Sequence, residues 1–104
     1  MAQLSIIFWR DIPAQLNISL RGKRIKRELS DRFQKAIDQA AMQSNAYQSD
    51  SYLAEWHRGP NIACGDNLEK ELNKFVLDIE RKYTNRKLKA LSQAGGYNKE
   101  KGTN

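Results

Sequence analysis

Two short apolar segments near the N-terminus, separated by a proline, limit what this chain can fold into more than any other feature. Residues 3–10 are rich in Ile, Phe and Trp on both faces of an extended chain, which predicts a well-covered strand. Residues 14–20 alternate apolar and polar side chains, as a strand with one solvated face does. Because Pro13 cannot donate a ladder hydrogen bond, the sequence predicts a hairpin that turns at residues 11–13.

The rest of the chain predicts one more strand and helices to cover this hairpin. Ser30 is placed to cap a first helix, and Asp66 and Glu69 have the spacing of a capping box for a second. The apolar stripes of these helices are Phe33, Ala36, Ile37, Ala40 and Ala41, and then Leu68, Leu72, Phe75, Val76, Ile79 and Tyr83. Between them, residues 52–57 alternate and predict a third strand, with Tyr52, Ala54 and Trp56 on one face.

The order strand, strand, helix, strand, helix predicts an α+β fold in which two helices pack on one face of a small, mainly antiparallel sheet. A short helical segment over residues 88–91 follows, and Gly95 and Gly96 end it. We expect residues 1–95 to form a single domain and residues 96–104 to be a disordered polar tail.

The chain is basic, with a net charge of +6, and its cations are clustered. One cluster, the basic segment, comprises Arg21, Lys23, Arg24, Lys26 and Arg27; a second comprises Arg81, Lys82, Arg86, Lys87 and Lys89. Such clusters attract anionic partners, either acidic proteins or nucleic acid, although they are equally compatible with solvated surface. No apolar run approaches the ~20 residues of a membrane span, so we expect a cytoplasmic protein with no membrane partner.

Few residues could carry catalysis. Glu55 and His57 lie two positions apart on a predicted strand, so their side chains could form an acid–base pair, or could simply be an exposed polar face. Cys64 is the only cysteine and lies in a segment without a protease or oxidoreductase signature. With one histidine and one cysteine, any metal site would depend on scattered acidic residues, and the glycines have no nucleotide-binding spacing, so the sequence predicts neither a metal nor a cofactor.

Two strand ends combine a tryptophan with an arginine. Trp9, Arg10 and Asp11 lie at the end of the first predicted strand, and Trp56 and Arg58 lie at the end of the third. Both residue types are frequent in binding hot spots, so these five residues are the predicted binding surface. The alternative is that one or both tryptophans fill the core between sheet and helix.

Three stretches resemble a small bacterial family labelled virulence factor, or virulence-factor-related domain. They are residues 8–15, FWRDIPAQ, the helical residues 32–42, and residues 49–56, SDSYLAEW. The resemblance spans most of residues 4–60 and implies a stand-alone domain that is also similar to parts of larger bacterial proteins. It implies an accessory or protein-interaction role, and it brings no assigned catalytic residue.

Taken together, these features favour a non-enzymatic accessory or protein-interaction module. A nucleic-acid-binding protein that uses the basic segment and a small enzyme that uses Glu55 and His57 are the alternatives. A homodimer is a further expectation, because a three-stranded sheet leaves edges on which a second copy could pair.

Overall fold

The computed structural model describes residues 1–46 and 50–98 and has a mainly antiparallel sheet with helices, which confirms the predicted α+β class. The elements in chain order are β1 (Ala2–Trp9), β2 (Ile12–Leu20), β3 (Lys23–Glu28), α1 (Asp31–Gln43), α2 (Asp50–Ala54), β4 (Trp56–Arg58), β5 (Ile62–Cys64), α3 (Leu68–Lys82) and α4 (Asn85–Gln93).

The sheet is built around the predicted N-terminal hairpin. Its strand order is β3-β2-β1-β4, and β5 pairs with the other end of β1, every pair being antiparallel. The turn is tighter than predicted, because Trp9 pairs with Ile12 and only two residues lie between them. Pro13 therefore lies inside β2, opposite Phe8 of β1. The register of the two strands shifts here, between Ile7 and Phe8, and such an irregularity tolerates a residue without an N–H.

Three predicted segments differ from the structure. The basic segment forms β3 after a two-residue turn at Arg21 and Gly22, both with positive φ, as in a type I′ hairpin. The strand predicted over residues 52–57 is wrong: the short helix α2 covers its first part, and only Trp56–Arg58 pairs with β1. The loop predicted before the second helix contains β5, which pairs with residues 2–4.

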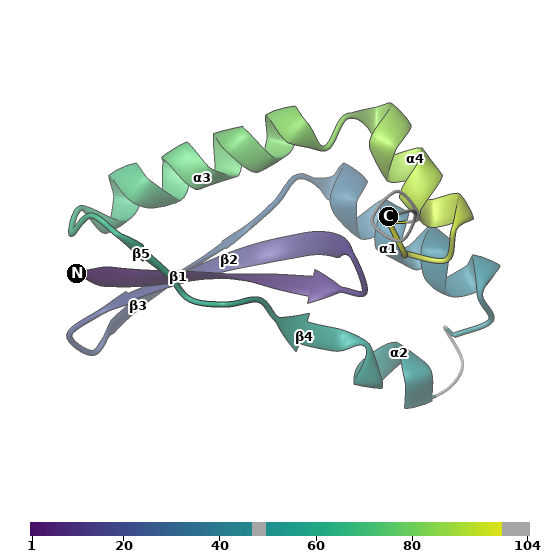
Figure 1. Ribbon diagram of the computed structural model, residues 1–104, viewed down its shortest axis with the longest axis horizontal. Coiled ribbons are helices and arrows are strands. Elements are labelled where there is room, and N and C mark those ends of the chain that lie inside the picture. The colour runs from purple at the N-terminus through teal and green to yellow at the C-terminus, as the bar shows by residue number, and fades with distance from the viewer. Residues whose placement is uncertain (47–49, 99–104) are drawn as a thin grey trace, which may run out of the picture.

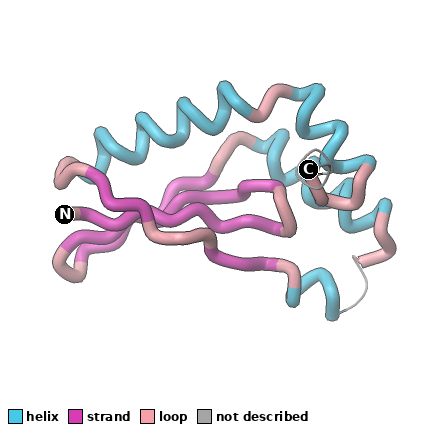
Figure 2. Tube along the Cα trace, viewed as in Figure 1, coloured by secondary structure: helices cyan, strands magenta, loops and turns pink. Residues whose placement is uncertain are grey.

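Helices cover one face and one end of the sheet. Helix α3 runs along the sheet, while α1 and α4 pack together near the β1–β2 turn (Figures 1 and 2). Leu4, Leu16 and Leu72 are fully buried in the core that the sheet shares with α3. All five residues of the first predicted helical stripe are buried, as expected for a helix that packs along one side.

The helix termini use different caps from those predicted. Ser30 is the N-cap residue of α1, but its hydroxyl bonds to Glu80 at 2.8 Å instead of to its own helix. Helix α3 begins one residue later than the predicted capping box, since Asn67 accepts a hydrogen bond from the Lys70 N–H at 3.2 Å. At Ser30 a tertiary partner, Glu80, takes the hydroxyl, which local spacing does not record, whereas at α3 the neighbouring Asn67 takes the capping position predicted for Asp66.

The end of the described chain packs against its beginning. Gly95 and Gly96 both have positive φ and end α4, as predicted. Residues 96–98, assigned to a tail from the sequence, contact the β1–β2 turn, and Gly96 is buried; residues 99–104 lie outside the described residues. In the described part of the chain, no helix has the length and apolar character needed to cross a bilayer.

Candidate functional site

Arg10, predicted as a surface contact, joins four parts of the chain. Its Nε lies 3.1 Å from a carboxylate oxygen of Glu55, and its Nη1 donates to the Ser44 hydroxyl at 3.1 Å and to the Gly95 carbonyl at 2.7 Å. The guanidinium centre lies 4.7 Å from the ring centroids of both Trp9 and Tyr97. Only 10% of the Arg10 side chain is exposed, so Arg10 is a structural clamp rather than a contact residue.

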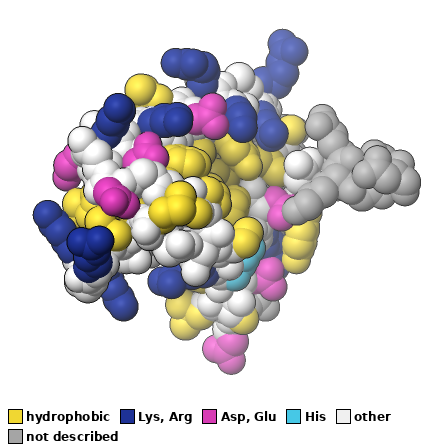
Figure 3. All heavy atoms as spheres, turned by 60° about the vertical axis from the view of Figure 1, so that its left-hand side comes forward, with side chains coloured by type: hydrophobic (Ala, Val, Ile, Leu, Met, Phe, Trp, Pro, Cys, Tyr) yellow, Lys and Arg dark blue, Asp and Glu magenta, His cyan; other side chains and the backbone are white. Residues whose placement is uncertain are grey.

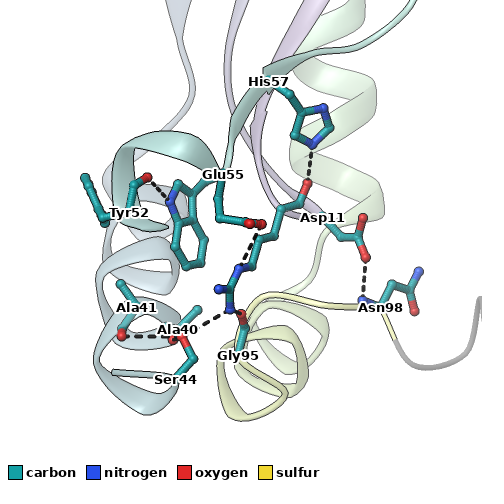
Figure 4. A network of polar contacts seen from close by, with 11 residues as sticks. Asp11, Ala40, Ala41, Ser44, Tyr52, Glu55, His57, Gly95 and Asn98 are labelled. Atoms are coloured by element: carbon teal, nitrogen blue, oxygen red, sulfur yellow. Dashed lines mark hydrogen bonds and ion pairs between the residues drawn. The ribbon is translucent and has the colours of Figure 1, made fainter. Parts of the chain in front are cut away.

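The neighbours of Arg10 complete this polar network. The Asp11 carboxylate accepts the Asn98 N–H at 2.7 Å, and the Asp11 N–H donates to the Gly96 carbonyl at 2.9 Å. His57 Nε2 lies 2.7 Å from the Arg10 carbonyl oxygen (Figure 4). The polar groups beside the β1–β2 turn therefore hold together segments that are distant in sequence.

The two predicted tryptophans have different environments. Trp9 is fully buried and donates its indole N–H to the Tyr52 carbonyl at 2.8 Å, so it belongs to the core. Trp56 is half-buried and packs edge-on against Tyr52. Arg58 alone of the five predicted surface residues is largely exposed. The structure therefore brings Trp9, Arg10 and Asp11 together as a packed unit and leaves Arg58 accessible.

Glu55 and His57 do not pair with each other among the described contacts. The Glu55 carboxylate binds the Arg10 guanidinium. The His57 ring stacks on the Phe8 ring, with 5.5 Å between the ring centroids, and it contacts the Arg10 carbonyl oxygen. An acid–base pair needs its two groups within hydrogen-bond reach of each other or of the proton that they transfer. Here, each side chain has a separate structural partner.

Cys64 is similarly enclosed. Its thiol is buried, and the sulfur lies 3.8 Å from the carbonyl oxygen of Ala2. Burial raises the pKa of the Cys64 thiol, and the carboxylates of Glu71 and Asp66 raise it further. A higher pKa reduces the thiolate population, which is the nucleophilic form.

The basic segment distributes its side chains over the two faces of the sheet. Arg27 points to the helix-covered face, where it binds Glu69 and Asn73 of α3 at 2.7 Å each. Because side chains alternate along a strand, Arg24 and Lys26 lie on the opposite face. The five clustered cations of the sequence therefore do not form one patch.

Arg24 and Lys26 line a shallow groove on the open face of the sheet, which we call the basic groove. Its volume is about 360 Å³, and Arg58 of β4 provides a third cation. The remaining lining residues are Gln3, Ser5, Asn17, Ile18, Ser19, Ile25 and Asn61. Figure 3 shows Lys and Arg side chains at the end of the molecule that carries the β2–β3 hairpin. The lining includes neither a carboxylate nor an aromatic ring, so the groove is suited to anionic groups.

The sequence had identified only part of this groove. The alternation of β2 correctly placed Asn17 and Ser19 on a solvated face, and charge identified Arg24 and Lys26. The sequence groups Arg58 with Arg10, because each lies near a tryptophan at the end of a predicted strand. Only the pairing of Arg58 with Ile7 across β1 and β4 shows that it lies on the face that carries Arg24.

Among the described residues, no three His, Cys, Asp or Glu side chains are grouped as ligands for a metal ion. The fold and its groove thus define a small α+β domain with a basic, open sheet face. The chain belongs to the family described as virulence factor, whose model matches residues 7–91. No curated protein and no solved structure matched the chain.

Proposed function

We propose that this protein is a non-enzymatic accessory module of the bacterial cytosol that binds an acidic segment of a partner protein in the basic groove. The observation that carries the proposal is the groove itself: Arg24, Lys26 and Arg58 line one cavity without a carboxylate among its lining residues. Cations in a shared concave site attract an anionic partner more strongly than the same cations scattered over a surface.

Protein is favoured over nucleic acid by the chemistry of the lining. Proteins that bind single-stranded nucleic acid commonly stack bases on aromatic side chains, and the groove has none. Amide and hydroxyl groups such as those of Gln3, Asn17 and Asn61 instead suit the peptide groups and carboxylates of a polypeptide.

A comparison of two triple variants tests the proposal. Arg24→Gln/Lys26→Gln/Arg58→Gln removes the groove cations, and Arg81→Gln/Arg86→Gln/Lys89→Gln removes the same charge from exposed residues outside the groove lining. The probe is fluorescently labelled poly-L-glutamate, titrated by anisotropy at an ionic strength of roughly 0.15 M. We expect the groove variant to weaken binding by about tenfold or more and the control by less than about threefold.

Equal effects of the two variants, or no binding of poly-L-glutamate by the wild-type protein, would contradict the proposal. A parallel titration with an oligothymidylate of similar charge examines the alternative partner. If the oligothymidylate binds more tightly and the groove variant abolishes its binding, the partner is a nucleic acid and the assignment to protein is wrong.

A further inference from the structure

Strand β3 has an uncovered edge beside the basic groove. Within residues 1–46 and 50–98, it is the terminal strand of the sheet and pairs with β2 alone. The Leu29 N–H, just after β3, donates to the Ala14 carbonyl of β2 at 3.1 Å. Because backbone direction alternates along a regular strand, residues 23, 25 and 27 also face β2. Residues 24, 26 and 28 therefore direct their N–H and C=O groups outward.

The same two residues thus offer a backbone edge and a charged groove. Arg24 and Lys26 carry outward backbone groups, and their side chains line the groove. A strand that pairs with β3 gains main-chain hydrogen bonds, and its alternate side chains lie beside these cations. Acidic side chains at those positions would be complementary in charge.

We propose that an extended acidic peptide adds to the sheet as a sixth strand along β3. This inference rests on the proposed function and specifies how the acidic segment binds. The peptide would place its carboxylates beside Arg24 and Lys26 near the β2–β3 turn, away from Glu28, the acidic residue at the other end of the strand.

A second copy of the chain that pairs over the centre of β3 brings like charges together. If two β3 strands paired antiparallel about Ile25, Arg24 would lie opposite Lys26, and Lys23 opposite Arg27. Like charges directly opposite each other destabilise a strand pair, and cationic edges are a known protection against self-association. An acidic peptide avoids this repulsion, which a second copy paired about Ile25 creates.

Two substitutions at one position separate strand pairing from charge. Lys26→Ala and Lys26→Pro both remove the ammonium group, but only proline also removes the outward N–H, and edge strands tolerate such a proline. The probe is a peptide of about ten residues in which Glu and Thr alternate, long enough to pair with the whole of β3. We expect Lys26→Pro to bind this peptide about tenfold more weakly than Lys26→Ala, with thermal unfolding confirming that both variants fold.

Amide hydrogen exchange of the wild-type protein provides a second measurement that needs no variant. The outward N–H groups of residues 24, 26 and 28 should exchange rapidly in the unbound protein and become protected when the Glu-Thr peptide binds. Protection of these amides before the peptide is added would show that a second copy already occupies the edge, and would overturn the inference.

Failure of this inference is distinguishable from failure of the proposed function. If the peptide binds and the groove cations are needed, but Lys26→Ala and Lys26→Pro bind equally and the outward amides stay unprotected, strand addition is wrong and groove binding stands. If the peptide does not bind the wild-type protein at all, both fail.

Discussion

Arg10 is a residue type that is common on contact surfaces, but in this protein its side chain stabilises the fold. It lies in the β1–β2 turn with a φ of 55°, a left-handed conformation that is unusual for a residue with a side chain. Its guanidinium lies over both the Trp9 and Tyr97 rings and binds Glu55 and Gly95. These contacts hold the turn in its conformation, and they leave little of the guanidinium for a partner.

We predict that Arg10→Ala lowers the free energy of unfolding by about 2–4 kcal/mol, because it leaves the partly buried Glu55 carboxylate without its cation. Arg58→Ala is the matched control; Arg58 is exposed, so the expected loss is within about 0.5 kcal/mol. Urea unfolding followed by tryptophan fluorescence measures both values. Similar losses in the two variants would show that Arg10 is not a clamp.

Glu80 gives a second prediction at this scale, and it depends on pH. Burial raises the pKa of Glu80, but hydrogen bonds from the Ser30 N–H and hydroxyl and from Arg32 outweigh burial and bring it below the ordinary value of 4.5. A pKa that folding lowers means that the ionised carboxylate stabilises the native state above about pH 4.5. This stabilisation is lost as the pH falls through the lower folded pKa.

Glu80→Gln should therefore cost about 1–2 kcal/mol at pH 7, and the difference from the wild-type protein should shrink below pH 4.5. Asp78→Asn, which removes an exposed ion pair with Lys82, should change stability by less than about 0.5 kcal/mol. Urea unfolding between pH 3.5 and 7, a range that extends about one unit below the ordinary carboxyl pKa, measures the difference. A difference that does not vary with pH would contradict the assigned hydrogen bonds.

At the scale of elements, sequence pattern predicted the segments with a clear period and missed those defined by a distant partner. The stripe of α1 and the alternation of β2 predicted both elements, because each has one buried side. Strand β3 has charged residues on both faces, so it carries no such period, and it forms because Arg27 binds α3 and Ile25 pairs with Ile18. The candidate site was predicted only in part, because its cations come from β3 and β4, which lie on opposite sides of β1 in the sheet. Their common position depends on strand pairing, which no local sequence period records.

The link between α4 and the segment after it gives a prediction at this scale. Gly22 and Gly96 both have positive φ, at 85° and 96°, but a Cβ on Gly96 would lie 2.9 Å from a ring carbon of the buried Trp9. A Cβ on Gly22 meets nothing within 4 Å. Gly22→Ala should therefore cost only the backbone strain, about 1 kcal/mol, and Gly96→Ala about 3 kcal/mol or more. Equal melting temperatures would show that the segment after α4 is not packed on Trp9.

For the molecule as a whole, the helices bury one face of the sheet, and the basic groove remains open on the other. The groove lies toward the β2–β3 turn, while the clamp around Arg10 lies at the β1–β2 turn. These two turns are at opposite ends of β2 (Figure 1). Because the clamp and the groove lining share no residue, substitutions in the groove can change binding without removing the contacts that hold the C-terminal segment. Binding and stability are therefore separable by mutation.

The clamp closes the fold by joining the first hairpin to the last described residues, and shortening the chain tests this. Residues 95–98 contribute the Gly95 and Gly96 carbonyls that accept from Arg10 and Asp11, the Asn98 N–H and the Tyr97 ring. A chain that ends at Ala94 should melt about 10–20 °C below one that ends at Asn98, since about 3 kcal/mol is lost in a domain of this size. Tyr97→Ala in the longer chain keeps the backbone contacts and should melt between the two. If all three melt together, the core alone fixes the β1–β2 turn, and the contacts of residues 95–98 follow from the fold without stabilising it.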